Sequence, residues 1–256
     1  MKINQVAAQL FTVRNFCKTA PDYAASLDKL AGIGYQAIQI SGVGPIPVQE
    51  LKSIADDHGM TICVTHEPGD KILDEPADIA ERIVALGAKH TAFPHPGGVD
   101  FSDPVQVEKM LNGLTAAHAV MAQAGVTLSY HNHALEFHRQ HGGQTVYEMI
   151  WEQTPLGMEL DTFWVQAGGA DPVDWCQRLK GRLPLIHLKD YAVNARGERY
   201  DAEIGAGNLR WPQIIAAAEA SGCQCFIVEQ DSASACGDPF EALGRSFHYI
   251  KTLLCK

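Results

Sequence analysis

The sequence predicts a single α/β domain over residues 1–256, folded as a (β/α)8 TIM barrel. Three observations support this prediction. The chain has 256 residues, and a barrel of this class typically needs about 250. Short apolar segments alternate with segments of helical period, which indicates a parallel sheet. Polar residues end nearly every apolar segment, as expected where strand ends form the mouth of a barrel.

The expected strands, in chain order, are Val6–Leu10, Ala37–Ser41, Thr61–Thr65, His90–Pro94, Thr127–His131, Met158–Thr162, Leu185–Lys189 and Phe226–Gln230. The helices expected between them are Tyr23–Gly32, Val48–His58, Ala77–Leu86, Val105–Ala124, Thr145–Gln153, Pro172–Leu179, Trp211–Ala220 and Pro239–Leu254. An open doubly wound sheet has the same alternation, but usually carries a glycine-rich phosphate turn after its first strand. Here Phe-Thr-Val-Arg-Asn follows that strand, so we prefer the closed barrel.

Local signals mark the ends of several helices. An Asp-Pro pair puts a capping carboxylate before a proline at the first helical position. This pair begins at Asp103, Asp171 and Asp238. Glycine separates a helix from the next strand at Gly59, Gly87, Gly125 and Gly222, a position where it commonly ends helices.

The charge balance argues against one class of partner. The formal net charge is −10, and such a surface repels phosphate backbones unless a local basic patch compensates it. The sequence has no Lys/Arg cluster of this kind, so we expect no nucleic-acid partner. No apolar run approaches the roughly 18 residues of a membrane span, and no signal peptide is evident. We therefore expect a cytoplasmic protein without a membrane partner.

The cysteine pattern favours reduced thiols. The seven cysteines are Cys17, Cys63, Cys176, Cys223, Cys225, Cys236 and Cys255. An odd number without framework spacing is typical of a reducing compartment. Cys223 and Cys225 have the spacing of a soft-metal pair, but they open the apolar segment Cys-Gln-Cys-Phe-Ile-Val. We interpret them as small buried residues of a strand.

The last four strands end in metal-ligand residue types. These ends carry His131, His133 and, just beyond, Glu136; then Asp161; then His187 with Lys189; and finally Glu229 with Asp231. Alternate residues of a strand share a face, so these side chains converge on one mouth if the barrel closes. Each residue alone has an ordinary structural explanation as a cap or a core group, but together they predict one divalent ion, Mn, Zn, Co or Mg.

Several segments together resemble one known family. They are Ala-Ala-Gln-Leu-Phe-Thr-Val-Arg (7–14), Tyr-His-Asn-His-x-x-Glu-Phe (130–137), Leu-Asp-Thr-Phe-Trp (160–164), His-Leu-Lys-Asp (187–190) and Val-Glu-Gln (228–230). In this order and spacing they are similar to the sugar phosphate isomerase/epimerase family, which belongs to the xylose-isomerase-like TIM barrels. The resemblance covers essentially the whole chain.

The resemblance implies a ligand set and a chemistry. In that family Glu, Asp, His and Glu from strands five to eight hold one metal ion, and Asp161, His187 and Glu229 match the last three. The first ligand is either His131, where many relatives have Glu, or Glu136. Relatives act on a ketose or inosose through a metal-stabilised cis-enediolate. Glu229 is then the base that also binds metal, with His131 or Glu136 on the other face of the substrate.

Further residues are candidates for contact with a small sugar-like substrate. Lys189 shares a face with His187 and suits a developing oxyanion, although a salt bridge is the alternative. The candidates for hydroxyl or ring contact are His66, His95, His133, Gln9 and Trp164. Arg14 suits a surface salt bridge better than an anion site, and Phe11, Phe163 and Trp211 are interpreted as packing or as an apolar wall.

Two other classes of function remain open. A lyase or dehydratase acting on an inosose or keto-glycoside begins with the same proton abstraction beside a bound carbonyl. A non-catalytic metal- or sugar-binding barrel is compatible with His131 at the first ligand position. An endonuclease relative of this barrel is disfavoured because it needs several metals and basic loops. Homo-oligomers are common among relatives, so a homo-oligomer is possible here.

Overall fold

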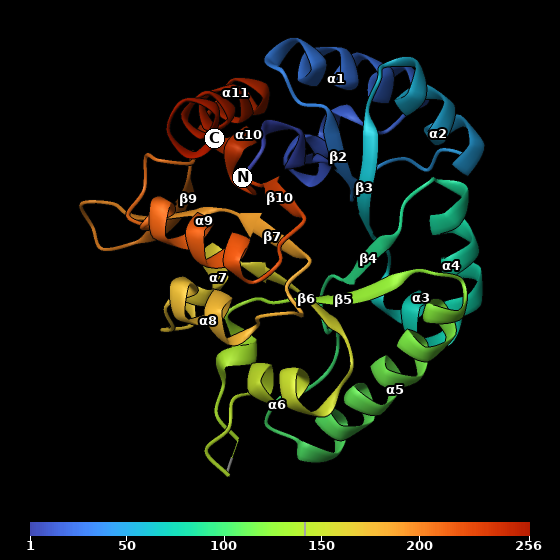
Figure 1. Ribbon diagram of the computed structural model, residues 1–256, viewed down its shortest axis with the longest axis vertical. Helices are drawn as coiled ribbons and strands as arrows, with labels where there is room; N and C mark the ends of the chain where they lie inside the picture. The colour runs from blue at the N-terminus through green and yellow to red at the C-terminus, as the bar shows by residue number, and fades with distance from the viewer. Residues whose placement is uncertain (141) are drawn as a thin grey trace.

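The computed structural model describes residues 1–140 and 142–256, and within them the expected strands close into one parallel barrel (Figure 1). Around the barrel the order is β1-β2-β3-β4-β5-β6-β7-β10. The bounds are β1 (Val6–Gln9), β2 (Ala37–Ile40), β3 (Thr61–His66), β4 (His90–Phe93), β5 (Thr127–His131), β6 (Gly157–Asp161), β7 (Leu185–Leu188) and β10 (Cys225–Val228). Pairing of Val6 with Phe226 joins the first strand to the last. The predicted fold class is therefore confirmed.

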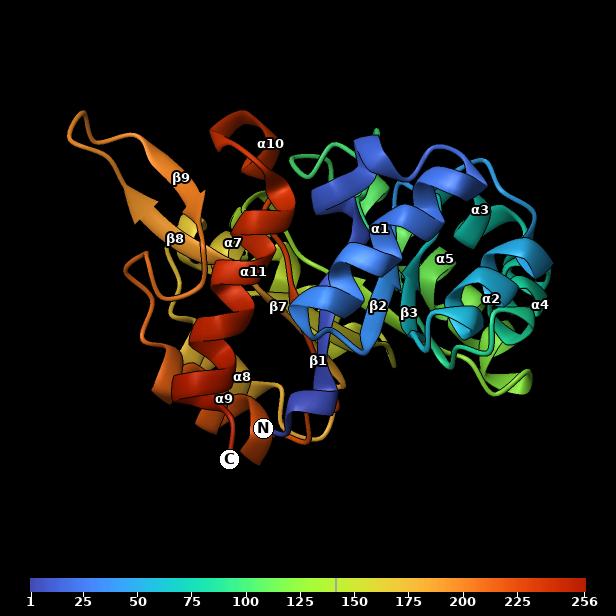
Figure 2. The ribbon, with the colours of Figure 1, turned by 90° about the horizontal axis from the view of Figure 1, so that it is seen from above.

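Helices surround the barrel on the outside (Figures 1 and 2). Their bounds are α1 (Ala20–Ile33), α2 (Val48–Asp57), α3 (Gly69–Asp74), α4 (Pro76–Ala85), α5 (Pro104–Gln123), α6 (Val146–Gln153), α7 (Thr162–Ala167), α8 (Pro172–Arg178), α9 (Trp211–Ala220), α10 (Ala233–Cys236) and α11 (Pro239–Tyr249). The remaining helical turns are η1 (Ile3–Gln5), η2 (Leu10–Phe16), η3 (Leu135–Phe137) and η4 (Ile250–Leu254). The last predicted helix thus ends as an α-helix at Tyr249 and continues as one π-helical turn.

The predicted boundary signals behave as expected. Asp103, Asp171 and Asp238 each accept a hydrogen bond from the backbone N–H two residues later. The glycines that were expected to end helices have φ between 64° and 90°, a left-handed conformation that costs glycine little. Thr145 was expected inside a helix. It is instead the N-cap of α6, in a reciprocal capping box with Glu148.

The barrel interior changes from apolar to polar along the strand direction. Near the start of the strands, small and apolar inward residues pack together, among them Ala7, Leu185 and Cys225. The next inward positions on the same strands carry Gln9 and His187, both fully buried. Because alternate residues of a strand share a face, a strand that begins with an apolar inward residue can end with a polar one. The polar inward side chains therefore lie at the mouth of the barrel.

An antiparallel hairpin follows β7 and was not predicted. It consists of β8 (Asp190–Val193) and β9 (Arg199–Ala202), and it projects from the body of the barrel (Figure 2). The two chain ends lie close together, with the Lys256 N–H donating to the Met1 carbonyl at 3.2 Å. Among the described residues, none of the helices is both long and apolar enough to cross a bilayer.

Candidate metal centre and active site

Four buried side chains from the ends of β5, β6, β7 and β10 meet at the mouth. We call His131, Asp161, His187 and Glu229 the outer set. Their ligand atoms all lie within 4.8 Å of one another. Nδ1 of His187 lies 3.0 Å from Glu229 Oε2 and 3.8 Å from Asp161 Oδ2. The structure thus brings the expected Asp, His and Glu together, and it adds His131 rather than Glu136 to them.

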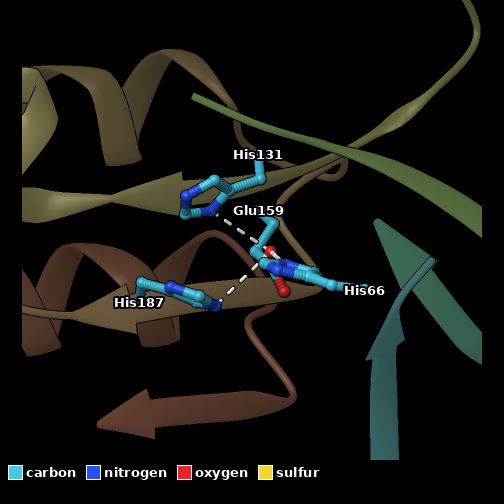
Figure 3. Close-up of side chains that lie close together, drawn as sticks. All are labelled: His66, His131, Glu159 and His187. Carbon is cyan, nitrogen blue, oxygen red and sulfur yellow. Dashed lines mark hydrogen bonds and ion pairs between the residues drawn. The ribbon is translucent and has the colours of Figure 1, made fainter. Parts of the chain in front are cut away.

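A second group lies deeper in the barrel and shares His131 and His187 with the first. We call His66, His131, Glu159 and His187 the inner set; the four side chains converge in Figure 3. Glu159 Oε2 is 2.5 Å from His66 Nε2, 3.2 Å from His131 Nδ1 and 3.4 Å from His187 Nε2. The two ring nitrogens of His187 therefore face different sets, Nδ1 the outer set and Nε2 the inner set. One carboxylate orients three imidazoles.

Glu159 is a site residue that the strand-end pattern does not indicate. It precedes Asp161 by two positions on β6, so both side chains point into the barrel. The alternation is present in Met-Glu-Leu-Asp, but the strand-end pattern points only to the terminal Asp. A fully buried carboxylate at this position needs partners to offset its desolvation, and the histidines of the inner set provide them.

The pKa values of Glu159 in the inner set and Asp161 in the outer set shift in opposite directions. Burial alone would raise the pKa of Glu159, but His187 and His66 hold it well below its usual range. Burial would lower the pKa of His187, but Glu159 and Glu229 hold it well above its usual range. Burial raises the pKa of Asp161 to about 7, although Lys189 and His187 oppose that rise. Of the three carboxylates in the two sets, Asp161 is therefore the one least compensated by its protein neighbours.

The outer set fits a divalent ion by its donor chemistry. Within the described residues, Asp161 Oδ2 is a buried oxygen without a hydrogen-bond partner. A cation at this point would partner that oxygen and would offset the repulsion between Asp161 and Glu229. Burial and the neighbouring His187 lower the pKa of His131 to about 4, which leaves a neutral imidazole able to ligate. Mixed imidazole and carboxylate donors suit Mn, Zn, Co or Mg.

Lys189 adds a buried cation beside the outer set. Its Nζ lies 3.4 Å from Glu229 Oε2 and also pairs with Asp231. The same Nζ lies 5.2 Å from the Trp164 ring centroid and 5.7 Å from that of Phe163. Burial opposes the charge, but Glu229 and Asp161 raise the pKa of Lys189. A fixed ammonium group thus lies at the mouth of the barrel.

An amide ladder supports the site from below. Gln9 Nε2 donates to Gln39 Oε1 at 2.7 Å, and Gln39 Nε2 donates to Glu159 Oε1 at 2.9 Å. Gln39 Oε1 also lies 2.7 Å from His187 Nε2. Gln9 was expected to contact substrate, but it is fully buried in this ladder. Its contacts position the site from inside the barrel.

A pocket of about 620 Å³ opens above the outer set. The substrate-contact candidates His66, His95, His133 and Trp164 all line it. His133 packs edge-on against His95 and tilts toward Trp164, with centroids 4.9 and 5.3 Å apart. Burial, then His131 and His95, lower the pKa of His133 to about 2. His133 therefore adds an uncharged aromatic ring with polar edges to this wall.

Several other candidates lie outside this pocket's lining. Glu136 Oε1 accepts from the Tyr130 hydroxyl at 2.9 Å, and Oε2 accepts from the His133 backbone N–H at 2.7 Å. Burial raises the pKa of Glu136 to about 7. Arg14 donates to the Phe11 carbonyl at 2.7 Å and stacks on the Phe11 ring. Glu136 thus holds the loop after β5, and Arg14 holds the turn after β1.

Trp211 and Phe163 have packing roles. Trp211 is buried on α9, and its Nε1 donates to Asp190 Oδ2 at 2.7 Å. Asp190 also accepts from the backbone N–H groups of Gly205, Gly207 and Leu209. This one carboxylate therefore ties the segment after the hairpin to the end of β7, next to Lys189. Phe163 is buried beneath Trp164 in a T-shaped contact of 4.8 Å.

A family model described as a xylose isomerase-like TIM barrel matches residues 27–253. The chain belongs to this family. The resemblance seen in the strand-end motifs is thereby confirmed, and it comes with the closed barrel and the polar mouth expected of such a protein. A comparison with curated proteins gives no match.

Solved structures with the same fold include sugar-acting enzymes. A sugar phosphate isomerase/epimerase from Parabacteroides distasonis has a TM-score of 0.84 at 20% identity, covering 99% of this chain and 96% of that chain. A D-allulose 3-epimerase from Methylomonas sp. has 0.69 at 13% identity, covering 98% of each. The probable 3-DHS dehydratase from Bacillus anthracis has 0.74 at 14% identity, covering 99% and 100%. At these identities the likeness establishes the fold.

Proposed function

We propose that this protein is a divalent-metal-dependent isomerase or epimerase of a ketose or a related sugar. The observation that carries the proposal is the outer set, a buried group of two imidazoles and two carboxylates at the floor of a pocket of about 620 Å³. The pocket has room for a small polyhydroxylated molecule. The family and the similar epimerase structures support this choice of reaction.

Asp161, His187, Glu229 and His131 would hold the ion. A bound divalent ion supplies Lewis-acid polarisation of a substrate carbonyl. Glu229 takes the proton from the carbon next to that carbonyl, since its carboxylate lines the pocket and stays ionised. His131 lines the pocket with it and is neutral at pH 7, so where its imidazole does not bind the ion it is a candidate base for the other face of the substrate. The Lys189 ammonium balances the negative charge that develops on the substrate oxygen.

The remaining wall residues orient the substrate. His133 Nδ1 and Trp164 Nε1 are buried ring nitrogens without a hydrogen-bond partner in the part of the chain that the structure describes. Both residues line the pocket, together with His66 and His95. Hydroxyl groups of a sugar would supply partners for such ring nitrogens, since each hydroxyl both donates and accepts.

A lyase or dehydratase is the second candidate. It is favoured by one specific finding, the fold shared with the structure of the probable 3-DHS dehydratase. Both reactions begin with removal of a proton beside a polarised carbonyl, and they differ in whether a leaving group departs. The mass of the product separates them, because an isomerase conserves mass and a dehydratase loses water.

Elemental analysis and solvent exchange test the proposal together. We expect about one equivalent of Mn, Zn, Co or Mg per wild-type chain, lost in Asp161→Asn and in His187→Asn and kept in the exposed control Asp174→Asn. Ketoses and inososes incubated with the loaded enzyme in D2O should gain one deuterium beside the carbonyl, as measured by NMR. Absence of stoichiometric metal after reconstitution would overturn the metalloenzyme proposal. Metal without exchange or elimination on any sugar would favour a binding barrel.

A further inference from the structure

The pocket at the mouth extends well beyond the outer set. Its far side is formed by the segments after β1, β2 and β3 and by α4, and β3 lies across the barrel from β7 in the strand order. A ketohexose of about twelve non-hydrogen atoms fills about 360 Å³ even at water's loose share of about 30 Å³ per atom. Against a cavity of about 620 Å³, this leaves roughly 260 Å³. A second ring of about eleven atoms takes about 330 Å³ on the same measure, so it would have to extend beyond this cavity.

We call Phe11, Gly42, Val43, Glu67, Pro68 and Arg82 the distal subsite; all six line this pocket. Phe11 is held in a fixed position. The Arg14 guanidinium lies 4.2 Å from its ring centroid, and a Cβ on Gly42 would come within 3.0 Å of its ring. A fixed aromatic ring with neighbouring proline and valine side chains is suited to the C–H face of a sugar ring.

An ion pair forms the polar part of the distal subsite. Arg82 Nε contacts both carboxylate oxygens of Glu67, at 3.2 and 3.1 Å. The guanidinium carries four further N–H donors, and the Arg82 side chain is 30% exposed. Because Glu67 neutralises Arg82, the pair suits an uncharged ligand with hydroxyl groups better than a phosphate, which the carboxylate would repel.

The distal subsite also leads outward. A neighbouring cavity of about 420 Å³ shares Val43 and Arg82 with the pocket and continues along Pro45, Ile46 and Pro47. The hollow surface is therefore continuous from the outer set to the edge of α2 and α4. Such a shape suits a two-ring ligand better than a single ring that ends at the metal.

We propose that the substrate is a ketose linked through a glycosidic bond to a second, uncharged sugar ring, which lies in the distal subsite. The second ring would rest its C–H face on Phe11 and would direct hydroxyl groups to Arg82 and Glu67. This inference rests on the proposed function, since the ketose half is placed over the outer set. It adds the substrate class, a keto-disaccharide or similar glycoside.

Binding of sugars to the metal-loaded protein tests the subsite. The probes are D-fructose and the keto-disaccharides lactulose, maltulose and isomaltulose, titrated by calorimetry. We expect at least one disaccharide to bind about tenfold more tightly than D-fructose, as one or two added hydrogen bonds would give. In Arg82→Met and in Phe11→Leu, the Kd of that disaccharide should come within about twofold of the Kd of D-fructose, and the Kd of D-fructose should stay unchanged.

Two further variants complete the experiment. Arg245→Met is the matched control, because Arg245 also pairs with a glutamate, Glu203, but does not line this pocket. It should keep the preference for the disaccharide. Arg82→Lys keeps the charge beside Glu67 but removes the planar fork, so it should lose most of the preference while circular dichroism shows an unchanged fold.

The proposal is overturned if none of the disaccharides binds more tightly than D-fructose to the wild type. It is also overturned if Arg82→Met weakens both ligands equally. Failure of the proposed function has a different signature, because metal content and deuterium exchange are measured without any disaccharide. Normal metal content and deuterium exchange without a preference for a disaccharide would contradict the distal subsite and leave the proposed function in place. A preference for the disaccharide that depends on Arg82, without stoichiometric metal or deuterium exchange, would support the distal subsite and contradict the proposed isomerase function.

Discussion

Replacing Glu136 by Gln separates a structural carboxyl group from a metal ligand. Glu136 is fully buried, and its two oxygens accept from Tyr130 and from the His133 backbone. Gln has nearly the same shape. Its oxygen can accept from the His133 N–H while its amide donates to the Tyr130 hydroxyl oxygen. The substitution therefore keeps the packing and removes only the ability to ionise.

The expected effect on stability depends on pH. Burial raises the pKa of Glu136 from 4.5 to about 7 in the folded protein. Between these values the folded protein holds a proton that the unfolded chain has released, so its free energy of unfolding falls as pH rises. The free energy of unfolding falls by about 1.4 kcal/mol for each pH unit in this range, so the wild type has lost about 3 kcal/mol at pH values above 7. Glu136→Gln should match the wild type near pH 4.5 and exceed its stability by about 3 kcal/mol near pH 8.5.

Thermal unfolding of chelator-treated protein measures this difference at several pH values. A gain of about 3 kcal/mol corresponds to roughly 6–12 °C in Tm for a chain of this size class. Glu148→Gln is a control of opposite sign, because a backbone hydrogen bond from Thr145 lowers the pKa of Glu148. That control should lose more stability at high pH. The reasoning would be refuted if the stability gain of Glu136→Gln over the wild type were constant with pH or became smaller as pH rises. Loss of metal from Glu136→Gln would show instead that Glu136 is a metal ligand.

Two other substitutions test the groups that hold the site in place. Glu159→Gln should weaken metal binding about tenfold to hundredfold, because the carboxylate that orients His131 and His187 is lost; competition with a chelating dye measures this, and unchanged affinity would contradict the role given to the inner set. Asp190→Asn places an amide against N–H donors of the segment after the hairpin, and the amide NH2 cannot accept their hydrogen bonds. The substitution should lower the free energy of unfolding by about 2–4 kcal/mol and Tm by at least about 4 °C. The exposed control Asp174→Asn should stay within about 1 °C, and equal Tm values for the two variants would contradict the prediction.

The barrel itself was predictable because its signals are local. Alternation of apolar strands with helical segments, Asp-Pro caps such as Asp103 and glycine stops such as Gly59 each act within a few residues of the chain. The strand-end residues Asp161, His187 and Glu229 could be proposed as neighbours because a closed parallel barrel brings all strand ends to one mouth.

The rest depended on distances between strands, which periodicity does not contain. Only the tertiary structure put His131 in the outer set and turned Glu136 toward Tyr130 and His133, since a few residues of loop after β5 reverse where a side chain points. Only the closed interior showed that Glu159 meets three histidines from other strands, and that Gln9 lies beneath the site. The chain's local pattern determined which side chains face inward, and the packing of the barrel decided which of them touch.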